Sequence, residues 1–147
     1  MAIGYNKIFV DTAIFIYYLE KHPLYFDAAK AFFESCIKSG KTVLTSVVTV
    51  QEYLVYPYMQ SDQALIENFN RFLTACGVHV IDITRSIAEK AAEIRAELHS
   101  LKGMDALQLA SALISGCDAF FTNDVRLCRY DKLFCLTLDM WKQSPQI

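Results

Sequence analysis

The chain has 147 residues, which fits one domain with a full hydrophobic core, and we expect residues 1–147 to form a single domain. Although 54% of the residues are apolar, no apolar run approaches the roughly 20 residues that a membrane-spanning helix needs, so we expect no membrane segment. A formal net charge of −2 excludes a global attraction to nucleic acid, and any such binding requires a local basic patch.

The first residues and the cysteines bear on the cellular compartment. MAIGYNKIFV lacks the basic leader and the long apolar region of a secretory signal, so we expect the protein in the cytoplasm. The cysteines are odd in number and form no CxxC pair, and we interpret all five as reduced core residues. They are Cys36, Cys76, Cys117, Cys128 and Cys135. The scattered histidines lack the spacing of zinc ligands, so no zinc site is expected.

Two elements are predicted at the start of the chain, and a third follows them. KIFV, at residues 7–10, is typical of a buried strand, and AIFIYYLE after it predicts a helix that ends before His22 and Pro23. Apolar residues then recur at helical spacing from Ala28 to Ile37, which predicts an amphipathic helix that ends at Gly40.

The middle of the chain predicts a second strand, two helices and a third strand. TVLT, at residues 42–45, is rich in β-forming residues, and SVVTVQEYLVY predicts a helix that Ser46 caps and Pro57 closes. Another helix is predicted from about Asp62 to Ala75, and VHVI, at residues 78–81, predicts the third strand.

In the last third of the chain, predicted helices and strands alternate again. The segment from Ser86 to Leu101 places apolar residues on one helical face and predicts a helix. MDALQLASALIS predicts a second helix, which is almost apolar. AFFT predicts the fourth strand, and FCLTL predicts the fifth. Short apolar strands separated by helices indicate an α/β fold with a parallel sheet that is covered by helices on both faces.

Four acids lie close to junctions between these elements. Asp11 ends the first strand, Glu52 lies in the helix after the second strand, Asp105 begins the helix that leads into the fourth strand, and Asp124 follows that strand. The carboxyl ends of parallel strands meet at one edge of a sheet, so these acids are expected to converge there. Taken singly, each has another interpretation, as a helix cap, a first-turn acid favoured by the helix dipole, or a solvent-exposed side chain.

Converging carboxylates predict a bound cation. Two carboxylates about 4 Å apart repel each other by roughly 4 kcal/mol at an effective dielectric constant near 20, so a cluster of four requires a positive charge. Oxygen ligands alone select Mg²⁺ or Mn²⁺. Such ions among carboxylates lower the pKa of a bound water and stabilise a leaving oxygen in phosphoryl transfer. The pattern therefore predicts hydrolysis of a nucleic-acid backbone.

The motifs FVDTAIFIYYLE, TSVVTVQE, MDALQLASAL and FFTND, in this order from about Ile8 to Leu138, resemble those of PIN-domain ribonucleases, especially VapC-type toxins. The resemblance implies a PIN-like parallel sheet of about five strands in the order 3-2-1-4-5, covered by helices on both faces. It also implies an endoribonuclease that depends on Mg²⁺ or Mn²⁺ and acts on single-stranded or looped RNA.

The resemblance assigns roles to individual residues. The catalytic and metal-binding residues are Asp11, Glu52, Asp105 and Asp124, with Asp11 and Asp105 as the main ligands. The polar residues that hold carboxylates or waters in place are Thr12, Ser46, Thr122 and Asn123. Gln108 departs from the family because its amide lies in a usually apolar helix, and Leu127 stands where an aromatic residue often follows the last motif. We expect both to affect packing or substrate fit and to leave the acids untouched.

Basic residues near the acids are candidates for RNA binding. Arg126, Arg129 and Lys132 lie just beyond Asp124, and Lys102 lies close to Asp105, so each could contact RNA phosphates or could be ordinary surface charge. Two further acids, Asp82 and Asp118, are interpreted as turn residues.

Tyrosines on the helices after the first two strands suggest protein interfaces. They are Tyr17, Tyr18, Tyr53, Tyr56 and Tyr58. The resemblance implies a homodimer and a cognate antitoxin that wraps these helices and blocks the acidic pocket. Two alternatives stay open: a catalytically silent PIN domain that acts as a binding module, and a housekeeping nuclease of RNA processing.

Overall fold

A five-stranded parallel sheet in the order β3-β2-β1-β4-β5 organises the computed structural model, which describes residues 4–143. The strands are β1 (Lys7–Val10), β2 (Thr42–Ser46), β3 (His79–Ile81), β4 (Ala119–Thr122) and β5 (Cys135–Thr137). In the central strand, Ile8 is aligned with Val43 of β2 on one side and with Ala119 of β4 on the other. The predicted fold class and strand order are confirmed.

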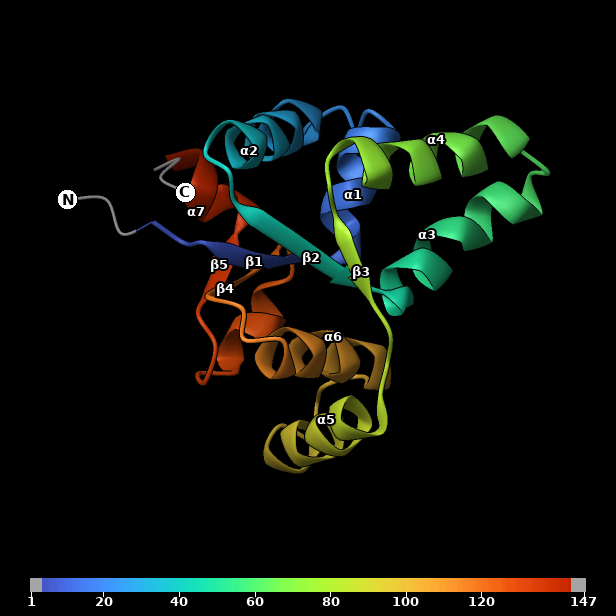
Figure 1. Ribbon diagram of the computed structural model, residues 1–147. Helices are drawn as coiled ribbons and strands as arrows, with labels where there is room; N and C mark the ends of the chain where they lie inside the picture. The colour runs from blue at the N-terminus through green and yellow to red at the C-terminus, as the bar shows by residue number, and fades with distance from the viewer. Residues whose placement is uncertain (1–3, 144–147) are drawn as a thin grey trace.

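Helices connect the strands and cover both faces of the sheet (Figure 1). They are α1 (Thr12–Leu19), α2 (Phe26–Lys38), α3 (Val47–Met59), α4 (Gln63–Ala75), α5 (Arg85–Glu97), α6 (Gly103–Ile114) and α7 (Leu138–Gln143), with a 3-10 helix η1 (Val125–Arg129). Core residues of α1, α2, α4 and α7 pack on one face, and those of α5, α6 and η1 pack on the other. Among residues 4–143, no helix is long and apolar enough to cross a membrane.

The two faces of the sheet are filled by alternate residues of each strand, because successive side chains of a strand point in opposite directions. In β1, Ile8 belongs to the core beneath α1 and α2, whereas Phe9 belongs to the core beneath α5 and α6. In β4, Phe120 stacks on Phe9 with ring centroids 5.4 Å apart, and Phe121 stacks on Phe32 of α2 at 3.9 Å. Burial on both faces explains why these strands are continuously apolar.

Two predicted helix ends are wrong. Helix α3 runs through Pro57 to Met59, although Pro57 was expected to close it. Pro57 lacks the N–H for one helical hydrogen bond, but the last turn still closes because the N–H of Gln60 donates to the Tyr56 carbonyl at 3.0 Å, and the proline ring is buried. Helix α5 ends at Glu97 and not at Leu101, because Leu98 leaves the helical conformation at φ −122° and ψ 83°.

The prediction that every cysteine is a reduced core residue is wrong for one pair. Cys128 of η1 and Cys135 of β5 form a disulfide with 5.1 Å between their Cα atoms. The bond joins the segment after Asp124 to the first residue of the edge strand. Cys36, Cys76 and Cys117 are free, and the first and last of these are buried. A disulfide is uncommon in a chain that is expected to be cytoplasmic.

Candidate active site

Asp11 lies where β1 passes into α1 and is fixed by the ends of two strands. Its backbone N–H donates to the carbonyl of Phe121 at 2.9 Å. Its carboxylate accepts from the backbone N–H of Thr12 at 2.9 Å and from the hydroxyl of Thr122 at 2.8 Å. Asp11 therefore caps α1, as the simpler interpretation proposed, and at the same time places a carboxylate at the carboxyl edge of the sheet.

The other three acids reach the same edge from three different elements. Glu52 projects from α3, where one carboxylate oxygen accepts from the Thr12 hydroxyl at 2.8 Å. Asp105 occupies the first turn of α6. Asp124 follows β4 and caps η1 by accepting from the backbone N–H of Arg126 at 3.0 Å.

The pKa values of Asp11 and Asp105 reflect both burial and nearby charge. The pKa of Asp11 is raised from 3.8 to about 6, mainly by burial and to a smaller extent by the charges of Glu52 and Asp105, while the hydrogen bonds from Thr122 and Thr12 lower it. Burial and the charge of Asp124 raise the pKa of Asp105. The charge of one acid therefore acts on the next: Glu52 and Asp105 act on Asp11, and Asp124 acts on Asp105.

Arg126 neutralises part of this charge within the chain. Its guanidinium donates through Nε to Asp124 Oδ1 at 2.9 Å and through Nη2 to Asp124 Oδ2 at 2.6 Å. This paired contact lowers the pKa of Asp124. A cation that binds Asp124 must therefore compete with Arg126.

The donor set fits a hard divalent cation. All four groups are carboxylates, and a bound cation would favour the ionised forms of Asp11 and Asp105, whose pKa values burial and neighbouring acids raise. Within residues 4–143, no three His, Cys, Asp or Glu side chains are already gathered as a metal site. Three of the acids have partners within the chain: Thr122 donates to Asp11, Thr12 donates to Glu52, and Asp124 is paired with the Arg126 guanidinium.

The predicted polar residues play different parts. Thr12 and Thr122 donate directly to acids, and Thr122 also accepts from the backbone N–H of Asp124 at 3.1 Å. Ser46 caps α3 and donates to the buried amide of Gln108, so it does not touch an acid itself. Asn123 donates to the hydroxyl of Tyr17 at 2.9 Å.

A cleft of about 700 Å³ opens beside the acids. Glu52 and Asp105 lie on its wall together with Lys102, Arg126 and Arg95. Small residues of α5 supply an apolar lining, namely Ala88, Ala91 and Ala92. The cleft thus combines carboxylates that suit a metal ion with three cations that suit a polyanion.

Arg95 is the cleft residue that the sequence interpretation missed. Its signal is its spacing from Ala88 and Ala92, because positions separated by seven and three residues lie on one helical face. The predicted basic residues all lie close in sequence to the acidic motifs, whereas α5 carries none of these motifs.

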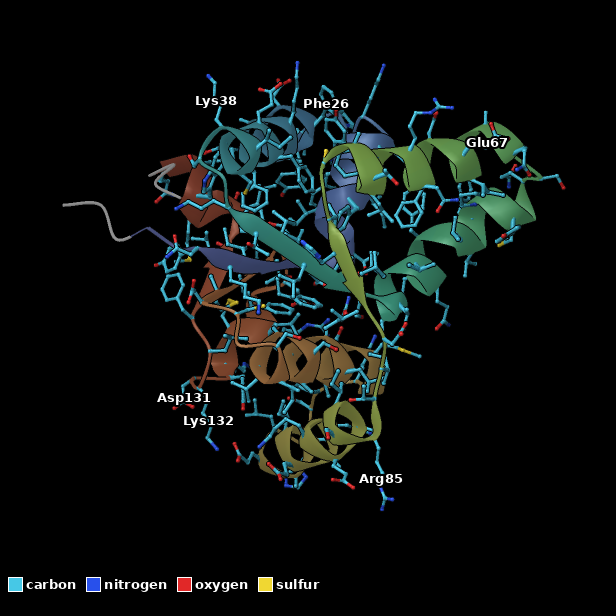
Figure 2. The ribbon with its side chains drawn as sticks, in the orientation of Figure 1. Phe26, Lys38, Glu67, Arg85, Asp131 and Lys132 are labelled. Atoms are coloured by element: carbon cyan, nitrogen blue, oxygen red, sulfur yellow. A yellow bond between two sulfur atoms is a disulfide. The ribbon has the colours of Figure 1, made fainter. Side chains whose placement is uncertain are left out.

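Only two of the four predicted RNA-binding residues line the cleft beside the acids. Arg126 and Lys102 line the cleft, whereas Arg129 is exposed at the end of η1. Lys132 pairs with Glu97 at 2.8 Å. In Figure 2, Lys132 lies on the side where β1 and β2 begin, away from the edge that carries the acids. The chain must return to that side before β5, because β5 runs parallel to β4.

Comparison with known proteins identifies the family of this chain. The sequence matches the model of the PIN domain over residues 8–133. The chain belongs to the PIN-domain family. Curated protein sequences give no significant match to this PIN domain.

Solved structures resemble this PIN domain at the level of the fold. VapBC2 of Rickettsia felis, bound to a promoter DNA fragment, superimposes with a TM-score of 0.73 at 21% identity, over 89% of this chain and 98% of that one. VapC20 of Mycobacterium tuberculosis, a toxin that cleaves the sarcin-ricin loop, gives 0.68 at 20%, over 84% and 95%. FitAcB of Neisseria gonorrhoeae gives 0.68 at 18%, over 89% and 97%.

Proposed function

We propose that this PIN domain is a divalent-metal-dependent endoribonuclease. The observation that carries the proposal is that four carboxylates from four separate segments lie at one sheet edge, where the charges of Glu52 and Asp105 act on Asp11 and the charge of Asp124 acts on Asp105. Such a charge cluster is costly to fold without a function that uses it. The family membership and the cleavage of RNA by VapC20 support the same proposal.

Asp11 and Asp105 would be the main ligands of Mg²⁺ or Mn²⁺, and Glu52 and Asp124 would bind the ion or orient water. A bound ion would lower the pKa of a water molecule and stabilise charge on the phosphate. The chain's own contribution is to fix the oxygens: Thr122 holds Asp11, and Thr12 holds Glu52. Asp124 becomes available when Arg126 turns from the carboxylate toward another anion.

The cleft between α5 and α6 supplies a path for the RNA strand. Arg95, Lys102 and Arg126 would neutralise phosphates next to the acids, which favours binding because counterions are released. Among the described residues, no aromatic ring lines this cleft. Recognition there would rest on the backbone of the RNA and on its shape more than on base stacking.

We further propose that the nuclease is the toxin of a toxin–antitoxin pair in the cytoplasm. A second hollow, of about 330 Å³, lies between α1, the start of α2, α3 and α4 and is lined by Tyr18, Phe26, Tyr53 and Phe72. Its largest side chains are aromatic. An apolar antitoxin segment would fill this hollow. The VapBC structures of Rickettsia felis and Salmonella typhimurium, which share this fold, support such a partner.

The end of α3 supports self-association. Tyr56 and Tyr58 are 54% and 64% exposed, and Val55 and Met59 are exposed beside them. We propose that this patch pairs with a second copy to form a homodimer. A chain that stays monomeric in sedimentation at high concentration would contradict this part of the proposal.

Cleavage of a mixed RNA pool tests the nuclease function. The wild-type chain should cut RNA with Mg²⁺ or Mn²⁺, should stop cutting in EDTA, and should lose activity in Asp105→Asn. Asp82→Asn is the matched control, because Asp82 is an exposed acid after β3. Mn²⁺ binding without cleavage of any RNA would indicate a narrow substrate, and absence of Mn²⁺ binding would favour the silent binding module.

Expression in cells separates a toxin from a housekeeping nuclease. The wild-type chain should arrest growth, Asp105→Asn should not, and the product of a neighbouring gene should bind the chain and restore growth. Normal growth of cells that contain active nuclease would favour the housekeeping alternative.

A further inference from the structure

A buried amide lies behind the acidic edge, on the core-facing side of α6. Gln108 is 1% exposed, and the polar residues around it, Thr12, Ser46 and Thr49, are at most 5% exposed. They come from four elements: α6, the start of α1, the end of β2 and the first turns of α3. Buried polar groups of this kind require hydrogen-bond partners, and here each one has them.

The hydrogen bonds form a continuous chain that ends on an acid. Ser46 Oγ contacts Gln108 Oε1 at 2.5 Å, and Gln108 Nε2 contacts Thr49 Oγ1 at 2.9 Å. Thr49 Oγ1 lies 3.0 Å from Thr12 Oγ1, which donates to Glu52 Oε1 at 2.8 Å. We call these four residues and Glu52 the Glu52 hydrogen-bond chain.

The carboxylate fixes the direction of every bond in the Glu52 hydrogen-bond chain. An ionised carboxylate only accepts, so the single hydroxyl hydrogen of Thr12 is used on Glu52. The contact between Thr12 and Thr49 then uses the hydrogen of Thr49, and Thr49 accepts from the amide nitrogen of Gln108 and from the hydroxyl of Thr45 at 2.8 Å. The amide carbonyl is left facing Ser46, which donates to it.

We propose that Gln108 is a positioning residue that orients Glu52 through Thr49 and Thr12. An apolar side chain at position 108 would fill the same space but would leave Thr49 with the Thr45 hydroxyl as its one remaining donor, and Ser46 without its acceptor. Thr49 and Thr12 would then be held less firmly, and Glu52, which projects from α3 and is exposed, would lose the defined orientation of its carboxylate. The consequence for metal binding rests on the proposed function, whereas the Glu52 hydrogen-bond chain itself does not.

The competing explanation is that Gln108 serves only to satisfy buried hydroxyls. In that case its environment would be independent of Glu52. The side-chain amide resonances of Gln108 in metal-free protein distinguish the two explanations. They should move more in Glu52→Ala than in Asp105→Ala, although Asp105 lies one turn away on the same helix. Movement that is equal or smaller in Glu52→Ala would overturn the proposal.

Metal affinity provides the second measurement. Mn²⁺ binding by electron paramagnetic resonance should weaken about tenfold in Gln108→Met and in Thr49→Val, whereas Thr49→Ser should remain close to wild type because it keeps the hydroxyl. Ser111→Ala is the matched control, because Ser111 is a buried hydroxyl of α6 that donates to the Leu107 carbonyl and has no link to Glu52.

The outcomes separate the two proposals. Unchanged Mn²⁺ affinity in folded Thr49→Val would overturn the role of Gln108, and this variant serves even if Gln108→Met does not fold. A wild-type chain that does not bind Mn²⁺ would refute the proposed metal site, while the Gln108 resonances would still decide whether the Glu52 hydrogen-bond chain exists.

Discussion

Replacing Asp11 by Asn should stabilise the metal-free protein at neutral pH. The folded state raises the pKa of this carboxyl from 3.8 to about 6, so it binds the proton more tightly than the unfolded chain does. The stability that the protonated form contributes is therefore fully present below pH 3.8 and is lost as the pH rises through about 6. Asn carries no charge at any of these pH values and can still accept from Thr12 and donate to Thr122.

The size of the effect follows from the pKa. A rise from 3.8 to about 6 corresponds to about 3 kcal/mol of lost stability at pH 7. The side chain of Asp11 keeps some contact with solvent, which reduces the expected gain to about 1 to 3 kcal/mol. For a chain of this size, that gain corresponds to about 3 to 9 °C in melting temperature.

Thermal melting in EDTA at pH 7 and pH 4 measures the gain, with Asp82→Asn as the control. Asp11→Asn should melt higher than wild type at pH 7, and the difference should shrink at pH 4, where the carboxyl is protonated in the folded protein. A variant that melts lower than wild type at pH 7, or that gains equally at both pH values, would refute the reasoning about clustered acids.

Further changes test the cleft and the disulfide. Arg126→Gln should strengthen Mn²⁺ binding by up to about fivefold, because it removes the ion pair with Asp124. Calorimetry would measure the affinity. Weaker Mn²⁺ binding would refute the competition between Arg126 and the metal ion for Asp124. Arg95→Gln should weaken RNA binding and lower the slope of log affinity against log salt by about one, whereas Arg85→Gln on the same helix should do neither. Cys128→Ser should reduce the free energy of unfolding by about 2 kcal/mol, and chemical denaturation should give the same value for reduced wild type.

The sheet and its acidic edge were predictable from the sequence. Strands such as KIFV and AFFT are continuously apolar because both faces of the sheet are covered, and the acids lie at fixed places relative to the strand ends. Parallel topology then brings Asp11 and Asp124 to one edge without any knowledge of side-chain geometry. Helices begin where the strands end, so Asp11 and Asp124 serve both as helix caps and as candidate site residues.

The features that the sequence did not predict depend on contacts between distant segments. Arg95 reaches the cleft only because α5 packs against α6, and Gln108 reaches Glu52 only through hydroxyls of two other elements. Lys132 is close to Asp124 in sequence but lies on the far side, because the chain turns back before β5. Proximity in sequence is thus a poor guide wherever the chain crosses from one edge of the sheet to the other.

The chemistry at the cut RNA ends tests the central claim most directly. RNA cut in ¹⁸O-labelled water should carry a linear phosphate with one ¹⁸O at the earliest times, because the acidic edge is proposed to direct water at the phosphate. This product should be absent with EDTA and with Asp105→Asn. A 2′,3′-cyclic phosphate as the first product, or cutting that survives both EDTA and the substitution, would contradict a metal-dependent hydrolytic site.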